Sequence, residues 1–441
     1  METVALHTLG CKLNFSETST IGSQFLAKGY RIVDFKDAAD IYVFNTCSVT
    51  ENAEKECRQL VRRVLRQNPD AYIIVTGCYA QLRPDEISEI EGVDAVLGTK
   101  EKFDIFNLLE NFNKKGLACT FVSPNGISDN FGHAHSTDAD NRTRAYFKIQ
   151  DGCDYKCSFC TIPRARGLSR SLDPDSLLSE FKSLLRDGYK EIILTGVNVG
   201  DYGKEYKTNL FALLCKMVDL PGDFRIRISS VEPNLLSDEI INLTAANEKM
   251  CRHFHIPLQS GSPKILRNMR RRYKIDDYSN LIAKLNSGIA GLGIGVDVIV
   301  GFPGESEENF LETYNFLRVL DITYLHVFTY SERPDTLAAS MPGRVDVFER
   351  KRRNNLLREL SDRKKNLFYN KMSGYELEVL FESENQNGLL HGFSSNYVKV
   401  AVPFNTDLIN NFARVRLNKT GNLICTGEIT AIKNSVDSLA S

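Results

Sequence analysis

Three cysteines lie close together in the stretch FKIQDGCDYKCSFCTIPRARGLSR, which covers residues 147–170. Cys153, Cys157 and Cys160 have the spacing CxxxCxxC, and Phe159 stands just before the third cysteine. Thiolates are the usual ligands of iron–sulfur clusters, and a short glycine-led loop allows three thiolates to converge on one cluster. Three ligands for a cluster of four irons leave one iron open. Zinc is the alternative, but a structural zinc site takes four ligands and no nearby His or Cys supplies a fourth.

This spacing, with an aromatic residue beside the last cysteine, resembles the signature of the radical S-adenosylmethionine superfamily. The resemblance implies that the open iron binds the amino and carboxylate groups of S-adenosylmethionine and passes an electron to its sulfonium. It also implies a partial barrel of six βα units that carries the cluster.

Three further cysteines follow strand-like runs in the first hundred residues. The runs TVALHTLG, DIYVFNTCS and AYIIVTGCYAQ end at or near Cys11, Cys47 and Cys78, and helical stretches separate them. The carboxyl ends of parallel strands share one edge of a sheet, so the three cysteines are expected to lie close together. We therefore predict a second iron–sulfur cluster with one free iron. The alternative is three separate core cysteines, which is the structural interpretation we keep for Cys57, Cys119, Cys215, Cys251 and Cys425.

The segments TLGCKLN, FNTCSVT and VTGCYAQ, followed by the second cysteine set, resemble the methylthiotransferases. The resemblance covers nearly the whole chain and implies two 4Fe-4S clusters and two molecules of S-adenosylmethionine. One cluster reduces S-adenosylmethionine to methionine and a 5′-deoxyadenosyl radical, and the other holds the sulfur to be inserted. It also implies that both free irons face one cavity between the first two domains.

The predicted fold class is α/β. Strand-like and helical runs alternate until about residue 343, and short strands with turns follow. We therefore expect a Rossmann-like parallel-sheet domain, a partial (β/α)6 barrel and a charged helix. A small β-barrel that resembles the OB-like TRAM domain should follow them. The expected boundaries are 1–113, a polar linker over 114–141, 142–343, a basic helical connector over 344–373, and 374–436.

Loop residues after the barrel strands are candidates for binding S-adenosylmethionine. By the resemblance, Gly196 and Asn198 in TGVNVGDYG hold the methionine amino group. The other candidates follow later strands, where the alternative is ordinary turn chemistry: Ser229, Ser230, Glu232, His255, Gln259 and Gly301.

Two basic runs predict contact with RNA, because phosphate contacts supply much of nucleic-acid affinity. Residues 264–274 hold six Lys or Arg and no acid, and residues 344–371 hold ten against four Asp or Glu. A solvated helix face is the alternative for such runs. The candidate RNA contacts are Arg164, Arg166, Arg270, Arg271, Arg272, Tyr397 and Lys399.

The motifs resemble most closely the methylthiotransferases that act on N6-threonylcarbamoyladenosine at position 37 of tRNA, in the anticodon loop. The carboxylate of that nucleoside favours a nearby cation, and Arg164 and Arg166 flank the first cluster. The alternatives are enzymes that act on isopentenyl-adenosine in tRNA or on an aspartate of a ribosomal protein, and an iron–sulfur RNA-binding sensor without turnover.

The composition is that of an ordinary globular protein with 441 residues, 42% hydrophobic and 25% charged residues and a net charge of −1. No apolar run is long enough to span a bilayer and no secretory signal is visible, so we expect no membrane partner. Eleven cysteines in the reducing cytosol favour metal binding over disulfides. The predicted chemistry also requires an electron donor, which the sequence does not identify.

Overall fold

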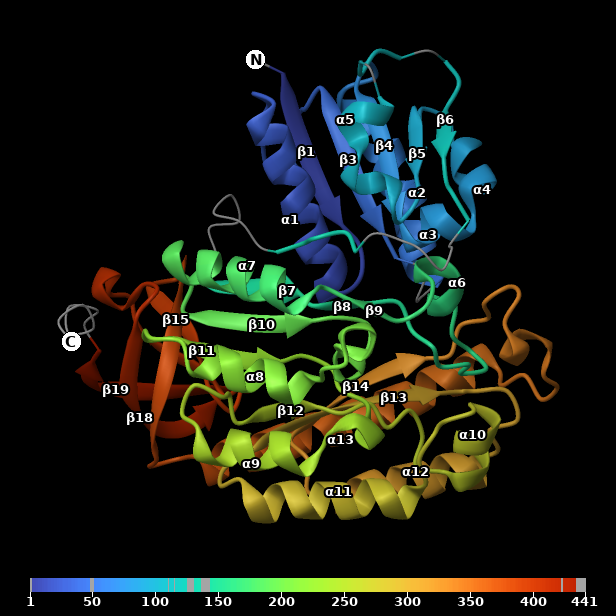
Figure 1. The fold of residues 1–441 in the computed structure, drawn as a ribbon. Coiled ribbons are helices and arrows are strands. Elements are labelled where there is room, and N and C mark those ends of the chain that lie inside the picture. The colour runs from blue at the N-terminus through green and yellow to red at the C-terminus, as the bar shows by residue number, and fades with distance from the viewer. Residues whose placement is uncertain are drawn as a thin grey trace.

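The computed structural model describes residues 2–47, 51–109, 111–114, 116–124, 131–135, 143–421 and 423–433, with the backbone alone at 51–54 and 419–421. The described chain forms three bodies (Figure 1): an N-terminal sheet domain, a larger barrel below it in this view, and a strand-rich C-terminal body against one side of the barrel. Part of the predicted linker, namely residues 115, 125–130 and 136–141, lies outside the described residues.

The N-terminal domain is a parallel sheet with strand order β2-β1-β3-β4-β5-β6. Val43 and Ile74 face one apolar core and Phe44 and Val75 face another, so both faces of the sheet are covered, as is typical of parallel sheets. The strands are β1 (Thr3–Thr8), β2 (Arg31–Ile32), β3 (Ile41–Thr46), β4 (Tyr72–Gly77), β5 (Ala95–Leu97) and β6 (Cys119–Phe121). The helices are α1 (Lys12–Ala27), α2 (Glu51–Gln67), α3 (Cys78–Leu82), α4 (Pro84–Ser88), η1 (Glu101–Phe103) and α5 (Ile105–Leu108).

Strand β6 corrects the predicted boundary between the first domain and the linker. Cys119 pairs with Ala95 and Phe121 pairs with Leu97, so the segment adds an edge strand to the first sheet. The expected linker therefore begins with a part of the domain that precedes it.

Six parallel strands form the partial barrel, which confirms the predicted fold class. Its two three-stranded sheets have the orders β11-β10-β7 and β12-β13-β14, and single bridges from Ile226 to Met250 and from Ser230 to His255 join them. The strands are β7 (Arg144–Lys148), β10 (Glu191–Thr195), β11 (Arg225–Ile228), β12 (His253–His255), β13 (Gly293–Val300) and β14 (Tyr324–Thr329). Helices cover the outside of these strands in Figure 1: α7 (Pro174–Arg186), α8 (Leu210–Val218), α9 (Asp238–Ala246), α11 (Ile275–Gly288) and α12 (Glu307–Val319).

Short elements occupy the ends and connections of the barrel strands. A short antiparallel pair joins Gln150 to Ser171, and the CxxxCxxC loop and the helix that follows it lie between these two strands in the chain. These elements are β8 (Gln150–Asp151), β9 (Arg170–Ser171), α6 (Ile162–Arg166), α10 (Pro263–Asn268), η3 (Val199–Asp201), η4 (Lys204–Tyr206), η5 (Pro233–Leu235) and η6 (Leu337–Ser340).

Helix α13 (Val347–Lys371) is the long charged helix that the sequence predicts, but two of its arginines point inward. Arg350 is buried against Glu332, and Arg353 is buried against Glu305 with an N–O distance of 2.7 Å. Part of this basic run therefore stabilises the packing of the helix on the barrel and does not face solvent.

The C-terminal strands close a small barrel in the order β15-β16-β17-β19-β18. Its elements are β15 (Glu376–Gln386), β16 (Leu389–Ser394), β17 (Lys399–Pro403), η7 (Thr406–Leu408), β18 (Phe412–Gly421) and β19 (Ile424–Ile432). Buried Arg225 and Arg227 on β11 both bind Glu191 and donate hydrogen bonds to carbonyls of Phe393 and Ser395. These bonds fix the small barrel to the larger one. In the part of the chain that the structure describes, no helix is long and apolar enough to cross a membrane.

Candidate functional site

The three N-terminal cysteines lie at one edge of the first sheet. Cys11 precedes α1, Cys47 follows β3, and Cys78 begins α3 directly after β4. Their strands β1, β3 and β4 are neighbours in the sheet, so the structure brings the three residues together. Burial raises the pKa of the Cys78 thiol, and the charges of Arg166 and Lys102 act in the opposite direction.

Gly10 makes this convergence possible. Its φ is +113°, and a Cβ at this position would lie 2.6 Å from Cβ and 2.9 Å from Sγ of Cys47. Only glycine accommodates both the left-handed backbone and the close approach. The loop that carries Cys11 therefore packs directly on Cys47.

The second cysteine set lies on the loop between β8 and α6. The backbone N–H of Cys153 donates to the carbonyl of Gly167 at 3.1 Å, and that of Cys160 donates to the carbonyl of Cys157 at 3.2 Å. Burial raises the pKa of Cys153 to about 11 and that of Cys160 to about 12. The guanidinium of Arg271 lies 3.3 Å from Sγ of Cys157 and offers positive charge to this loop.

The distances between the thiols distinguish an iron–sulfur cluster from a single zinc ion as the bound group. Among the described residues, the ligand atoms of His255, Asp297 and His326 all lie within 4.8 Å of one another, and neither cysteine set meets that limit. One zinc ion ligated by all three thiolates needs such proximity, whereas an iron–sulfur cluster binds each thiolate on a different iron. The distances between the thiols therefore argue against one zinc ion held by either set, and the thiolate ligands themselves suit an iron–sulfur cluster.

Two neighbouring cavities lie beside the two cysteine sets. The larger, of about 560 Å³, is lined by Cys11 and Cys47 from the first domain and by residues at the carboxyl ends of the barrel strands. The smaller, of about 210 Å³, is lined by Cys160 and by Gln259. Asp297 and Phe328 line both cavities. The space between the domains thus reaches a cysteine of each set.

Most of the predicted S-adenosylmethionine contacts lie in or beside these cavities. The larger cavity is lined by Gly196, Ser229, Ser230 and His255. The carboxamide of Asn198 is buried, and neither its nitrogen nor its oxygen has a hydrogen-bond partner in the described structure. Such an orphaned buried amide fits a position that a polar ligand completes.

Glu232 and Gly301 have partners within the protein. Glu232 forms an ion pair with Arg271 beside Cys157. Gly301 has a φ of +77°, and a Cβ there would lie 2.3 Å from Cγ of Arg350, so this glycine serves a close packing contact. Neither residue lines the two cavities as the structure describes them.

Sequence reasoning missed Asp297 and His326. Nε2 of His255 lies 2.8 Å from Oδ1 of Asp297, and Nδ1 of His326 lies 3.5 Å from the same oxygen. Burial acts to raise the pKa of Asp297, but the two imidazoles outweigh it and hold this pKa below its usual value. Burial and the neighbouring His255 lower the pKa of His326 to about 4. Each residue interrupts an apolar strand, in IGVDVIV and TYLHVFTYS, and this is the signal that indicates them.

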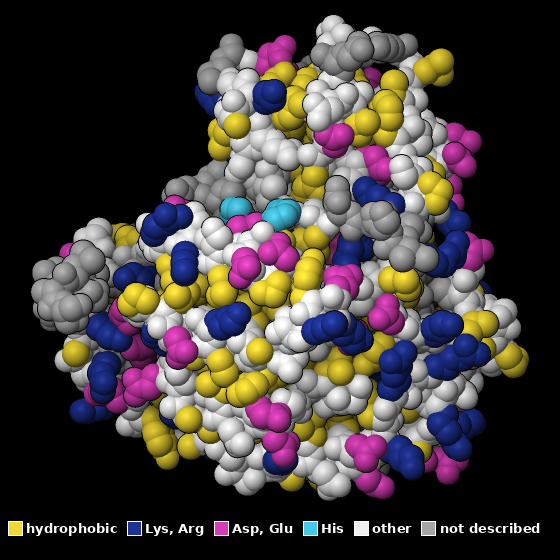
Figure 2. All heavy atoms as spheres, in the orientation of Figure 1, with side chains coloured by type: hydrophobic (Ala, Val, Ile, Leu, Met, Phe, Trp, Pro, Cys, Tyr) yellow, Lys and Arg dark blue, Asp and Glu magenta, His cyan; other side chains and the backbone are white. Residues whose placement is uncertain are grey.

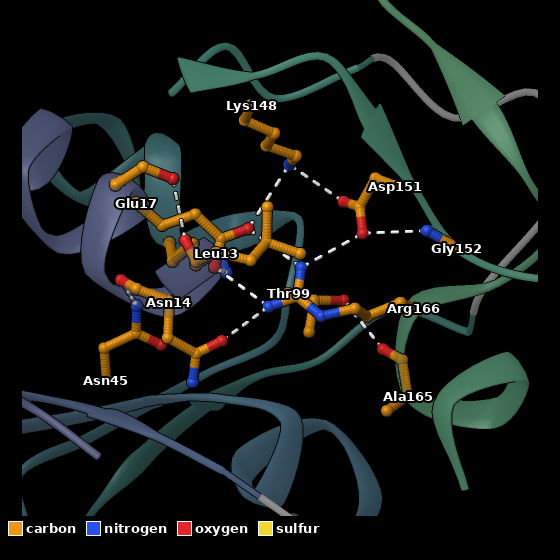
Figure 3. Close-up of polar contacts among 12 residues, drawn as sticks. Leu13, Asn14, Glu17, Asn45, Thr99, Lys148, Asp151, Gly152, Ala165 and Arg166 are labelled. Carbon is orange, nitrogen blue, oxygen red and sulfur yellow. Dashed lines mark hydrogen bonds and ion pairs between the residues drawn. The ribbon is translucent and has the colours of Figure 1, made fainter. Parts of the chain in front are cut away.

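A buried charge network joins the two domains beneath the cysteine loops (Figure 3). Glu17 on α1 is completely buried and forms ion pairs with Lys102, with Lys148 at 3.2 Å and with Arg166 at 2.9 Å. Asp151 binds Lys148 and Arg166 from the other side, at 2.8 and 3.0 Å. Arg170 also pairs with Asp151, at 3.0 Å, so four cations face the two carboxylates. The remaining positive charge lies near Cys78 and favours an anionic cluster there.

This network corrects the predicted role of Arg166 as an RNA contact. Its side chain is 1% exposed, and a second nitrogen donates to Oδ1 of Asn14 at 2.7 Å. Nδ2 of Asn14 in turn donates to the carbonyls of Leu9 and Thr46, which lie beside Cys11 and Cys47. Arg166 therefore links the cysteine loops of the two domains and is not presented to a substrate.

The other RNA candidates differ in their exposure. Arg270 and Arg272 are exposed, and the guanidinium of Arg272 lies 3.8 Å from the ring centroid of Tyr155. Arg164 is half exposed and pairs with Asp335 at 3.0 Å.

Three further candidates lie at internal or partly covered positions. The side chain of Arg271 is buried. Tyr397 packs between Phe393 and His253, so the structure brings it against the barrel instead of leaving it free to stack on a base. Lys399 is partly exposed.

Comparisons with known proteins agree with this arrangement. Residues 3–98 match the Uncharacterized protein family UPF0004, and residues 147–317 match the Radical SAM superfamily. The chain is 42% identical to threonylcarbamoyladenosine tRNA methylthiotransferase MtaB of Bacillus subtilis (strain 168), over 96% of this chain and 95% of that protein. It is 35% identical to the protein of the same name from Thermotoga maritima, over 97% and 98%. It is also 33% identical to tRNA-2-methylthio-N(6)-dimethylallyladenosine synthase of Clostridium novyi, over 96% of each chain.

Among solved structures, the radical S-adenosylmethionine methyltransferase TsrM from Kitasatospora setae, in a structure with tryptophan and an S-adenosylmethionine analogue, has a similar fold. The TM-score is 0.55 at 16% identity, over 77% of this chain and 75% of that chain. At this identity the likeness concerns the fold alone.

Proposed function

Since this chain belongs to the radical S-adenosylmethionine tRNA methylthiotransferases, we propose that it transfers a methylthio group to carbon 2 of N6-threonylcarbamoyladenosine at position 37 of tRNA. The observation that carries the proposal is the pair of adjoining cavities, which reach Cys11 and Cys47 on one side and Cys160 on the other. A nucleobase held there lies between both cysteine sets. Relatives named for this nucleoside match nearly the full length of the chain.

The six cysteines are proposed to hold two 4Fe-4S clusters, Cys153, Cys157 and Cys160 one of them and Cys11, Cys47 and Cys78 the other. When bound, the clusters and S-adenosylmethionine supply the radical and sulfur chemistry that acid–base catalysis cannot provide at an aromatic C–H bond. The protein's own residues orient the ligands: Asn198 offers its free carboxamide, and Arg271 holds Glu232 and Cys157 in place. Phe328, which lines both cavities, presents apolar surface to a base.

The RNA is proposed to bind over the basic run that follows the barrel's fourth strand. Lys264, Arg267, Arg270, Arg272 and Lys274 are exposed around α10. Figure 2 shows Lys and Arg side chains on the side of the barrel where Figure 1 places α6 and α10. Anticodon loops suit this enzyme because their bases unstack and can enter a cavity. A tRNA substrate also places the reaction in the cytoplasm.

The second candidate function is methylthiolation of N6-dimethylallyladenosine, because a synthase named for that nucleoside is 33% identical over 96% of this chain. Mass spectrometry of nucleosides from total tRNA, with and without the gene, separates the two. Loss of the 2-methylthio form of threonylcarbamoyladenosine, with accumulation of its precursor, is the expected result. Loss of the dimethylallyl product instead would establish the second function. No change in any tRNA nucleoside would contradict both.

A further inference from the structure

Lys12 is the one lysine or arginine among the described residues that line the larger cavity. Its titratable lining residues, apart from the two cysteines, are Lys12, Glu56, His255, Asp297 and His326. The low pKa of His326, a consequence of burial and of His255, leaves that imidazole neutral at pH 7. His255 is already paired with Asp297 at 2.8 Å, which leaves Lys12 as the cation of this lining to face an anionic ligand group.

Lys12 is also available for such a ligand. It is exposed, and it makes no hydrogen bond or ion pair with another residue that the structure describes. Lys12 lines the same cavity as Asp297 and His326, which belong to the barrel. The two arginines that the sequence offered for this role are engaged elsewhere, Arg166 in the buried network and Arg164 with Asp335.

The first turn of α1 adds to this positive potential. The helix begins at Lys12, has no acidic residue in its first turn, and has no side-chain cap at Cys11. The uncompensated N-terminal end of a helix carries a partial positive charge. Lys12 and the end of α1 thus act together on the part of the cavity next to Cys11.

We propose that Lys12 binds the free carboxylate of the threonylcarbamoyl group and so selects this nucleoside over those with an uncharged substituent on N6. This inference rests on the proposed function and deepens it. The substituent also carries hydroxyl and N–H donors, and Asp297 and His326, which line the same cavity, offer acceptors for them. A dimethylallyl group has neither a charge nor donors, and it would leave Lys12 desolvated without a partner.

The test compares two synthetic anticodon stem-loops with the cluster-loaded enzyme, S-adenosylmethionine and a chemical reductant. One RNA carries N6-threonylcarbamoyladenosine, and the other carries the same nucleoside with its carboxylate as a methyl ester. The readout is the ratio of kcat/KM for the acid over that for the ester, which cancels any general loss of activity. The variants are Lys12→Gln, Lys12→Arg and the control Lys28→Gln, at the other end of α1 and about 24 Å away along the helix axis.

We expect the wild type and Lys28→Gln to prefer the acid by about 10-fold to 100-fold, the range of a hydrogen bond to a charged group. Lys12→Gln should lower the ratio to near 1, and Lys12→Arg should keep a preference for the acid. A Lys12→Gln enzyme that retains the wild-type ratio would overturn the inference and leave the proposed function standing. A wild-type enzyme that does not discriminate between the acid and the ester would also overturn the inference. This outcome can be read even if the Lys12→Gln variant fails to hold iron. A wild type that modifies neither RNA would refute the proposed function and the inference with it.

Discussion

Replacing Glu17 by Gln perturbs a buried charge contact between the first two domains. Glu17 lies on α1 of the N-terminal domain, whereas Lys148 and Arg166 belong to the barrel, and all these side chains are at most 1% exposed. The substitution keeps the shape of the side chain and removes only its negative charge. Lys148 and Arg166 retain Asp151, but Lys102 loses the carboxylate with which it pairs.

The expected cost is about 3–5 kcal/mol of unfolding free energy, which is typical when one partner of a buried ion pair is removed and the other stays buried. Burial already lowers the pKa of Lys102, and Glu17 opposes this shift. Without Glu17 that pKa falls further, which limits the cost because the lysine can release its proton. The double variant Glu17→Gln with Arg166→Met should be less destabilised than the sum of the single variants, since each removes part of the charge that the other leaves unpaired.

The pH dependence gives a second, independent signature. Burial acts to raise the pKa of Glu17, but Arg166, Lys102 and Lys148 outweigh it and hold the pKa far below its usual value. A carboxyl whose pKa is lowered in the folded state stabilises the fold above its unfolded pKa of about 4.3, and this contribution is lost as the pH falls further. The difference between wild type and Glu17→Gln should therefore be full at pH 7 and shrink below about pH 4.

Urea denaturation followed by circular dichroism measures these free energies, with Glu91→Gln as the control because that carboxylate is exposed. The control should lie within about 0.5 kcal/mol of the wild type. The reasoning is refuted if Glu17→Gln is as stable as the control at pH 7, or if its deficit does not shrink on acidification.

Two further predictions concern the ligand sites. Asn198→Ala removes the buried, unpartnered carboxamide and should weaken binding of S-adenosylmethionine by about 10-fold. Equilibrium dialysis with the cluster-loaded protein measures this affinity, and an unchanged value would exclude Asn198 from the site. Gly10→Ala places a Cβ 2.6 Å from the Cβ of Cys47, at a position where the backbone φ is +113°. The variant should therefore bind half the iron per chain and keep the cluster of the CxxxCxxC loop. A colorimetric assay measures the iron, and full iron content would show that the loop tolerates a side chain.

The parts of the fold with local signals could be predicted from the sequence. The runs before Cys11, Cys47 and Cys78 are strands β1, β3 and β4, and the helical pattern around Cys57 is α2 with that cysteine buried. Alternation of strands and helices was enough to place the first three cysteines at one sheet edge.

The surroundings of the charged residues could not be predicted, because burial depends on partners that are distant in the chain. Arg166 beside a cysteine loop has the pattern of an exposed substrate contact, and its partner Glu17 lies 149 residues away on another domain. Arg353 belongs to a run with the pattern of a solvated helix, yet it pairs with Glu305 inside the protein. Strand β6 is three residues long, so its apolar pattern was too short to distinguish it from a linker.

The central claim is that two clusters with different tasks face the pair of adjoining cavities. Its most direct test is product analysis by mass spectrometry, with the threonylcarbamoyladenosine stem-loop as substrate and the wild type, Cys11→Ala and Cys157→Ala as enzymes. The wild type should form both 5′-deoxyadenosine and the methylthiolated nucleoside. Cys11→Ala should form 5′-deoxyadenosine without the methylthio product, and Cys157→Ala should form neither. A Cys11→Ala enzyme that still makes the methylthiolated nucleoside would contradict the account.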